Sequence, residues 1–143
     1  MDRDIFLGHF LTSGNLITMK KQVILVIDDE EEIRALFTRF LGRKGYHVES
    51  AGTLAEGRKI LEDVNPSLIF LDVNLPDGNG LEELFELRKA NLSEKVIMMS
   101  AFVHQEDRDL AHSMGAIDFF SKPFSLFILE QAVNSQLTKS INQ

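Results

Sequence analysis

The sequence predicts an α/β fold: a doubly wound, five-stranded parallel sheet flanked by five helices. From residue 22 onward, short apolar runs rich in β-branched residues alternate with longer segments of helical periodicity, which is the pattern of βαβ units. Four of the five runs are predominantly apolar, as expected of central parallel strands that are buried on both faces. Strict alternation implies right-handed crossovers, and in such sheets ligands bind at the carboxyl ends of the strands.

The predicted strands are short runs. They are VILVI at 23–27, HVES at 47–50, LIFL at 68–71, VIMM at 96–99 and IDFF at 117–120. The run that contains Val48 is the most polar of the five. We therefore expect that strand at an edge of the sheet, where one side of its backbone lacks a neighbour.

The first two helices are predicted from periodicity and from their ends. Apolar residues over 33–41 fall on one helical face, and Gly45 supplies a C-terminal stop. Thr53 and Glu56 have the spacing of a capping box at the start of the second helix. Pro66 follows closely enough to end that helix.

The other three helices are marked by apolar spacing and by capping residues. A third helix opens near Leu81, and Leu110 and Met114 mark a fourth that ends before Gly115. Ser125 is placed to cap a fifth helix. Each predicted strand is thereby followed by one helix, as the doubly wound arrangement requires.

Composition limits the size and class of the protein. The 143 residues, 44% of them hydrophobic, suffice for one well-packed core, so we expect a single globular domain. The 15 basic and 22 acidic residues give a net charge of −7, which disfavours direct binding to nucleic acid or anionic membranes. The chain has no cysteine for disulfides or thiol chemistry, and no apolar run approaches the roughly 20 residues that span a bilayer. We expect a cytoplasmic protein.

Residues 1–19 are expected to be an N-terminal extension to a domain formed by residues 20–143. The extension is somewhat apolar, but its acidic residues and the break at Gly8 and His9 make it a poor secretory signal. Met19 stands directly before the domain. The sequence leaves open whether residues 1–19 are disordered, arise from an upstream start or form an extra docking segment.

Chemically reactive side chains follow four of the predicted strands. Asp28 and Asp29 follow the first, Asp72 the third, Ser100 the fourth and Lys122 the fifth. Because parallel strands end at one edge of a sheet, we expect all five to converge. Three carboxylates there would repel one another by roughly 4 kcal/mol per close pair at an effective dielectric near 20, so the cluster requires a cation.

The donor set indicates which cation this is. Carboxylate ligands without histidine or thiol favour a hard divalent ion, and so few carboxylates, with room for waters, suit Mg²⁺ better than Ca²⁺. Mg²⁺ commonly serves phosphoryl transfer. A carboxylate such as Asp72 can then act as the nucleophile, with the charge of Lys122 and the hydroxyl of Ser100 directed at the transferred group.

From about residue 20 to residue 137 the chain closely resembles the receiver domains of two-component response regulators, especially the single-domain type that includes the chemotaxis receivers. The motifs that carry the resemblance are LVIDDE, LIFLDVNLPDGNG, MMSA and FFSKPF. A single acidic pair or Lys-Pro would be weak evidence, but the order and spacing of all four motifs are specific. The resemblance implies a flavodoxin-like sheet with strand order 2-1-3-4-5.

The resemblance also implies how the acidic residues act. Asp72 would be the phosphoacceptor, and Asp29 and Asp72 would bind Mg²⁺ directly. Asp28 would act chiefly through a metal-bound water, and the backbone carbonyl of Asn74 would be a further ligand. The phosphoryl donor would be a phosphohistidine on a sensor histidine kinase or a phosphotransfer protein.

A conformational switch is implied as well. Lys122 would pair with the phosphoryl oxygens, and its peptide bond with Pro123 would be cis. The Ser100 hydroxyl would move onto the phosphoryl group while Phe119, at a position often occupied by tyrosine, turns inward. A separate partner would read the change on the surface of the fourth helix, fifth strand and fifth helix, over about 103–137.

Each residue also has an ordinary structural interpretation. Asp28, Asp29 and Glu30 could be acids at the start of a helix, and Asp72 could form an Asx turn. Lys122 could be a solvated lysine, Ser100 a strand-end cap, and Phe119 a core aromatic. All of the site residues would then meet at one edge by coincidence, which we consider improbable.

Other functions fit less well. A Mg²⁺-dependent phosphohydrolase with an aspartyl nucleophile would need a second aspartate two residues after Asp72, and Asn74 stands there. A flavin carrier would not favour the acidic first loop, and a receiver that serves only as a scaffold would not need every chemical position filled. We expect a signalling protein and not an enzyme, monomeric or weakly dimeric on phosphorylation. The predicted fifth helix takes up the residues after Lys122, leaving no DNA-binding domain in this chain.

Overall fold

The chain forms an α/β domain preceded by a small hairpin, in a computed structural model that describes residues 6–12 and 15–137. The central sheet has five parallel strands in the order β4-β3-β5-β8-β9. Their bounds are β3 Val23–Ile27, β4 His47–Ala51, β5 Leu68–Asp72, β8 Val96–Ser100 and β9 Asp118–Ser121. Counted along the domain, this is the expected order 2-1-3-4-5.

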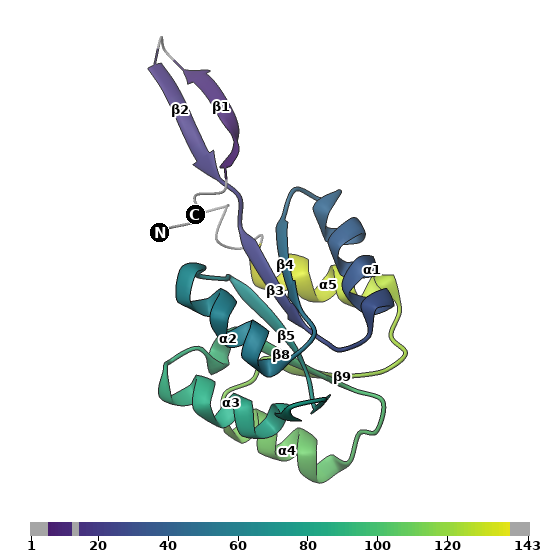
Figure 1. The fold of residues 1–143 in the computed structure, drawn as a ribbon. Helices are drawn as coiled ribbons and strands as arrows, with labels where there is room; N and C mark the ends of the chain where they lie inside the picture. Colours follow the sequence, from purple (N-terminus) through teal and green to yellow (C-terminus); the bar gives the residue numbers. More distant parts are fainter. Residues whose placement is uncertain (1–5, 13–14, 138–143) are drawn as a thin grey trace.

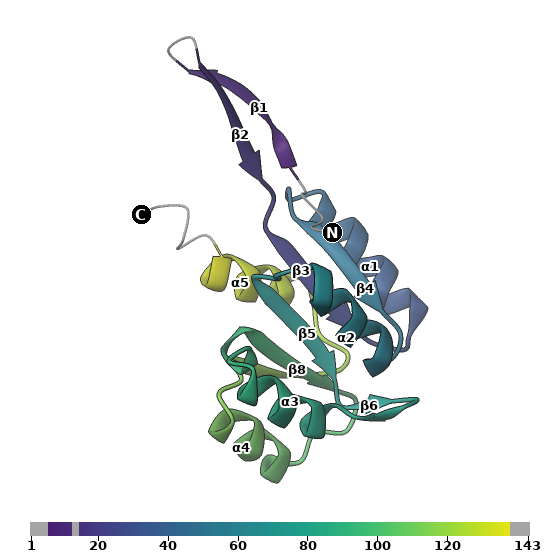
Figure 2. The same cartoon turned by 60° about the vertical axis from the view of Figure 1, so that its left-hand side comes forward.

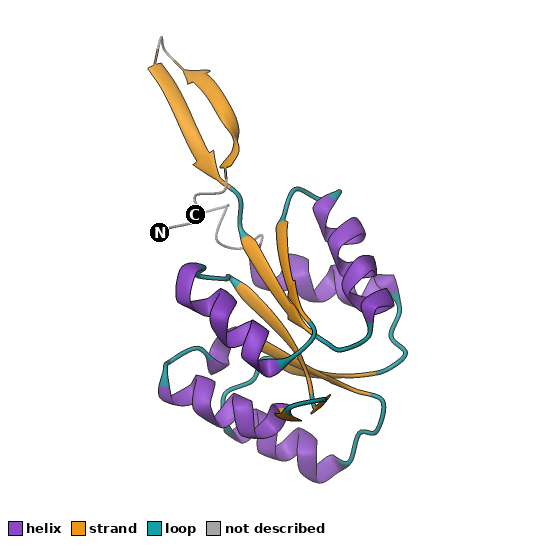
Figure 3. Cartoon of the chain, viewed as in Figure 1, coloured by secondary structure: helices purple, strands orange, loops and turns teal. Residues whose placement is uncertain are grey.

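Five helices cover the two faces of the sheet (Figure 1 and Figure 3). They are α1 Glu31–Gly42, α2 Leu54–Asp63, α3 Gly80–Lys89, α4 Gln105–Ser113 and α5 Leu126–Leu137, with a short 3₁₀ turn, η1, at Ser93–Lys95 before β8. Helices α1 and α5 pack on one face, and α2, α3 and α4 pack on the other. The predicted doubly wound fold is confirmed.

The strands are where the apolar runs place them. Strands β5 and β8 are buried along their whole length, whereas four of the five residues of β4 are partly or fully exposed. This confirms the expectation that the polar run around Val48 forms an edge strand. The buried runs are rich in Val, Ile, Leu and Met because helices cover both faces of these strands.

The helix ends follow the capping residues. Thr53 Oγ1 accepts a hydrogen bond from the Glu56 backbone N–H at 3.1 Å, and the Glu56 carboxylate accepts one from the Gly52 N–H at 3.0 Å. Ser125 Oγ accepts from the Ile128 N–H at 3.2 Å at the start of α5. Gly45 has a φ of +95°, a left-handed conformation that glycine adopts without strain.

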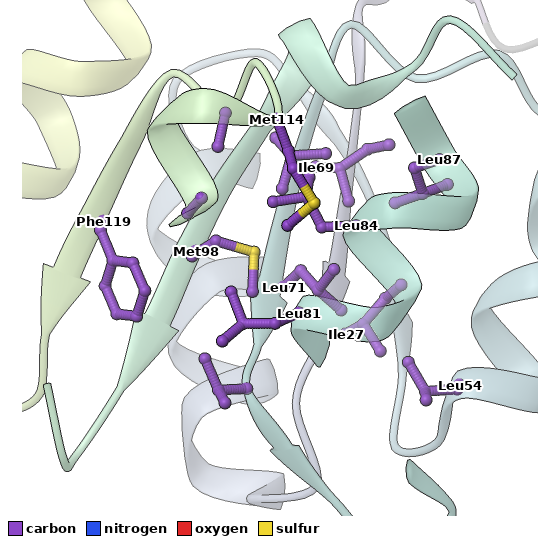
Figure 4. Packing of buried hydrophobic residues seen from close by; sticks show 14 of the residues in the cluster. Ile27, Leu54, Ile69, Leu71, Leu81, Leu84, Leu87, Met98, Met114 and Phe119 are labelled. Atoms are coloured by element: carbon purple, nitrogen blue, oxygen red, sulfur yellow. The ribbon is translucent and has the colours of Figure 1, made fainter. Parts of the chain in front are cut away.

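The core between the sheet and helices α2, α3 and α4 is shown in Figure 4, where Leu71 and Met98 from the sheet face Leu84 from α3. Each of these three side chains is 0% exposed. Burying one such side chain contributes roughly 1.5–3 kcal/mol of transfer free energy. This packing holds the strands in place against the helices. It thereby positions the residues that follow the strands.

Two features were not predicted from the sequence. Strands β1 (Phe6–Thr12) and β2 (Asn15–Lys20) form an antiparallel hairpin that covers most of the expected extension and ends one residue past it. The hairpin projects beyond the end of the sheet at which β3 begins (Figure 2). Residues 1–5 and 13–14 of that extension lie outside the described residues. Strands β6 (Asn74–Leu75) and β7 (Gly78–Asn79) form a second, very short hairpin after β5.

Candidate functional site

The site lies at the edge of the sheet where β3, β5, β8 and β9 end. Backbone hydrogen bonds extend the strand pattern slightly past the strands: the Asp28 N–H donates to the Ala51 carbonyl at 3.0 Å, and the Lys122 N–H donates to the Ser100 carbonyl at 2.8 Å. These bonds fix the backbone positions of Asp28 and Lys122 at the ends of strands β3 and β9. Asp72 is itself the last residue of β5.

Lys122 joins the acidic residues of this edge. Its Nζ lies 2.7 Å from Asp28 Oδ2, 3.0 Å from Asp72 Oδ2 and 3.2 Å from Glu30 Oε1. The lysine side chain is 10% exposed, and those of Asp28 and Asp72 are 0% and 6% exposed. This is a buried ion cluster, in which charges interact more strongly than at the surface.

Burial and the surrounding charges shift the pKa values in this cluster. Burial alone would lower the pKa of Lys122, but hydrogen bonds to Asp28 and Asp72 outweigh it and raise the pKa above its ordinary value. Burial raises the pKa of Asp72, the Lys122 hydrogen bond opposes that shift, and the charge of Asp28 adds to it. The raised pKa favours the charged form of Lys122, and a second cation beside Asp72 would favour the ionised form of that carboxylate.

Three carboxylates offer a place for that second cation. Oxygen atoms of Asp28, Asp29 and Asp72 all lie within 4.8 Å of one another. Asp29 is exposed, so the cluster is open to solvent on its side, and an ion there could keep several waters. This hard-oxygen donor set fits Mg²⁺. The Asn74 N–H, which donates to Asp72 Oδ1 at 3.3 Å, also places that residue beside the cluster.

The two expected switch residues are engaged elsewhere. The Ser100 hydroxyl donates to the Phe102 carbonyl at 2.9 Å and accepts from the Phe102 N–H at 3.1 Å. Phe119 is 5% exposed and already belongs to the core cluster. Ser100 thus stands at the expected edge with its hydroxyl bonded to its own loop, and the Phe119 ring is inside the domain.

The turn after β9 and the start of α1 complete the site. The peptide bond between Lys122 and Pro123 is cis, as the resemblance implied. Arg34, on α1, donates from Nη1 to the Asp28 carbonyl at 2.8 Å. Glu30 was expected to be an ordinary acid at a helix start, and Arg34 was not expected at the site. Glu30 directly precedes α1, and Arg34 lies in the first turns of that helix, where its side chain reaches the backbone of Asp28.

The structure thus brings together Asp28, Asp29, Asp72 and Lys122. The family model of the response regulator receiver domain matches residues 24–134, most of the chain. This chain belongs to the response regulator receiver domain family. Receiver domains of two-component systems act in signalling with histidine kinases or phosphotransfer proteins, and they bind Mg²⁺ at an acidic cluster of this kind.

Curated relatives are longer proteins. The chain is 38% identical over 117 residues to the alkaline phosphatase synthesis transcriptional regulatory protein PhoP of Bacillus subtilis, covering 82% of this chain and 49% of that protein. It is 37% identical over 121 residues to a probable transcriptional regulator, ycf27, of Porphyridium aerugineum, covering 85% and 50%. The chain spans about half the length of these two relatives.

Solved structures with this fold include single receiver domains. A CheY-like receiver domain protein from Methanospirillum hungatei superposes with a TM-score of 0.79 at 28% identity, covering 86% of this chain and 98% of that one. The response regulator TrrA from Thermotoga maritima, solved in complex with Mg²⁺ and BeF, gives a TM-score of 0.71 at 34% identity, covering 81% and 99%. Over the part of the chain that the structure describes, no helix is long and apolar enough to cross a membrane.

Proposed function

We propose that this chain accepts a phosphoryl group on Asp72 and signals by a change of conformation to a separate protein. The supporting observation is the bridge from Lys122 Nζ to Asp28 and Asp72, which fixes a cation beside a carboxylate at the open edge of the sheet. A lysine in this position can stabilise negative charge on a group that arrives at Asp72. An ordinary surface lysine would not be 10% exposed between two buried carboxylates.

The carboxylate of Asp72 would carry out the chemistry. One of its oxygens forms the new bond to phosphorus, while the bond from phosphorus to the donor imidazole breaks and the imidazole nitrogen keeps the electron pair and takes up a proton. Lys122 then exchanges part of its contact with Asp72 for the phosphoryl oxygens. Ser100, at the end of the neighbouring strand β8, would supply a hydroxyl donor to the same group.

Mg²⁺ would be held by Asp29, Asp72 and the Asn74 backbone carbonyl, with Asp28 acting through water. Bound there, the ion would neutralise charge on the transferred phosphoryl group. The chain supplies a hard-oxygen donor set that is open to solvent and a lysine that leaves the cluster still net negative. These properties support Mg²⁺ as the cofactor.

The partners follow from this chemistry. The donor would be a sensor histidine kinase or a phosphotransfer protein, and the output surface would be formed by α4, β9 and α5. We also propose that the domain spans residues 20–143 with residues 1–19 as an extension. The chain would work in the cytoplasm, without enzymatic turnover of an external substrate, as a monomer or a weak phosphorylation-dependent dimer.

Intact mass after incubation with acetyl phosphate, with and without Mg²⁺, tests the proposal. We expect one phosphoryl adduct that depends on Mg²⁺ and is absent from Asp72→Asn. Retention of a stoichiometric adduct on the peptide that contains position 72 in Asp72→Asn would refute the assignment. If the parent forms no adduct and binds no beryllofluoride, the chain is a scaffold receiver; rapid continuous release of inorganic phosphate would instead favour a phosphohydrolase.

A further inference from the structure

Side chains hydrogen-bond to the backbone of Phe119 on the outer edge of β9. Among the strands that the structure describes, β9 pairs with β8 alone and so ends the five-stranded sheet. Phe119 lies in the middle of β9: its N–H donates to Asp118 Oδ1 at 2.7 Å, and its carbonyl accepts from Arg108 Nη1 of α4 at 2.9 Å. At Phe119, the backbone hydrogen bonds that an edge strand would otherwise leave to water are thus supplied from within the domain.

Arg108 holds the ring of Phe119 as well as its backbone. The guanidinium carbon of Arg108 lies 5.6 Å from the centroid of the Phe119 ring, within the range of a cation–π interaction. The ring is 5% exposed and lies on the same side of the sheet as Met98, its partner in the β8–β9 register (Figure 4). If this ring rotated toward solvent, it would lose both its packing in the core and its contact with Arg108.

The loop after Ser100 has the opposite properties. The Phe102 side chain is 73% exposed, although both backbone polar groups of Phe102 bond to the Ser100 hydroxyl. A Ser100 hydroxyl that turned to a phosphoryl group on Asp72 would give up both bonds at once. Residues 101–104, which lead directly into α4, would then lose the two hydrogen bonds that shape this loop.

We propose that Arg108 is a positioning residue that locks Phe119 inside the domain, so that the loop around Phe102, and not the Phe119 ring, is the part of this chain that moves on phosphorylation. Helix α4 carries Arg108 and follows this loop, so a shift of the loop reaches β9 through the bond from Arg108 to the Phe119 carbonyl. The inference rests on the proposed phosphorylation of Asp72 for its trigger. The lock itself consists of the contacts of Arg108 with the Phe119 carbonyl and ring, and these contacts are present in the domain without a phosphoryl group.

Fluorine NMR tests the lock. We would place 4-fluorophenylalanine at position 119 and measure the change of its resonance between H₂O and D₂O, which reports solvent exposure of the ring. Three proteins are compared: the parent, Arg108→Leu, and Arg39→Leu, which removes an exposed arginine from α1 as a matched control. We expect a ring shielded from solvent in the parent and in Arg39→Leu, and a solvent-induced shift at least twice as large in Arg108→Leu.

Addition of Mg²⁺ and beryllofluoride tests which part moves. In the parent we expect a shift of the fluorine signal when the label is at position 102, and little change when it is at position 119. In Arg108→Leu, the label at position 119 should also respond, whereas Arg108→Lys, which keeps a donor and a cation, should behave more like the parent. A label at position 119 that moves to a solvent-exposed state in the beryllofluoride-bound parent would overturn the proposal.

Failure of the lock and failure of the proposed function give different results. The intact-mass assay with acetyl phosphate, run on the same samples, reports whether Asp72 is phosphorylated. Without an adduct or a beryllofluoride response, the phosphorylation proposal fails, and the ligand-free comparison of Arg108→Leu with the parent still decides the lock. Equal solvent-induced shifts in those two proteins, with both folded by circular dichroism, would mean that Arg108 does not position Phe119.

Discussion

Gly80, the first residue of α3, lies directly against the backbone of Asp72. A Cβ at position 80 would collide with the Asp72 carbonyl oxygen and would come 2.9 Å from the carbonyl carbon of Asp72 and 3.0 Å from Val73 Cα. The Gly80 N–H donates to the Val73 carbonyl at 2.6 Å, which draws the start of the helix onto the end of the strand. A helix can therefore begin this close to the candidate phosphoacceptor only because glycine stands at position 80.

Gly80→Ala is expected to move the end of β5 and disturb the site. All three contacts would be with backbone, which cannot rotate away, so we expect a loss of about 1–3 kcal/mol in the free energy of unfolding, measured by urea titration. Phosphorylation by acetyl phosphate should slow as well. Gly42→Ala is the matched control, because a Cβ there meets nothing within 4 Å; its unfolding free energy should be unchanged or higher.

Lys122→Ala should make the protein depend on Mg²⁺ for stability. Without the lysine, Asp28 and Asp72 remain buried and unpaired, which we expect to cost roughly 3 kcal/mol in the presence of EDTA. Mg²⁺ should raise the melting temperature of the variant more than that of the parent, because ligand that binds only the folded state stabilises it. Mg²⁺ binding should survive while the conformational response to beryllofluoride is lost.

Lys44→Ala is the control for that experiment. Lys44 pairs with Glu130 at 2.8 Å in a more exposed setting, with side chains 31% and 40% exposed. Such a pair contributes about 0–1 kcal/mol, so its loss should produce no new dependence on Mg²⁺. An equal Mg²⁺ effect in the parent and in Lys122→Ala would show that Lys122 does not balance the acidic cluster.

Arg34→Leu should weaken Mg²⁺ binding without removing a ligand. Arg34 fixes the backbone of Asp28 through the bond to its carbonyl, and groups that orient metal ligands commonly affect affinity by about 10-fold or more. The Kd for Mg²⁺, measured by isothermal titration calorimetry, should rise by roughly that factor. Arg39→Leu, on the same helix but exposed, should leave the Kd unchanged.

The sequence was sufficient to predict the elements that build the site. The apolar runs predicted the strands because a buried parallel strand has to be apolar on both faces, as the fully buried residues 68–71 illustrate. From the strands follows the edge at which Asp28, Asp72 and Lys122 meet. Site residues at the ends of strands can be predicted from the sequence, because the topology of the sheet alone determines where they lie.

The residues that were missed depend on how helices approach the sheet. Arg34 and Arg108 reach backbone carbonyls at sequence separations of 6 and 11, and no periodic pattern distinguishes them from solvated helix residues. Strands β6 and β7, with two residues each, are too short for any periodicity. The close approach of Gly80 to Asp72 likewise becomes visible only when the strand and helix are placed in space.

Asp77, in the short turn between β6 and β7, caps α2, a helix that is distant from it in sequence. Its Oδ1 accepts from the Leu54 N–H at 2.9 Å and its Oδ2 from the Ala55 N–H at 3.0 Å, at the start of α2. The hydrogen bonds from Leu54 and Ala55 lower the pKa of Asp77. The stability that this carboxylate contributes is therefore present above the pKa of an unfolded aspartate, about 3.9, and is lost as the pH falls through its lower folded value.

Asp77→Asn should consequently lower the melting temperature by a few degrees at pH 7. The difference from the parent should shrink as the pH falls below about 4, because protonation then weakens the same interaction in the parent. Asp63→Asn, at the C-terminal end of α2, where a negative charge opposes the helix dipole, should leave the melting temperature unchanged or raise it. A difference between Asp77→Asn and the parent that stays constant from pH 7 to pH 3 would mean that the charge of Asp77 does not stabilise α2.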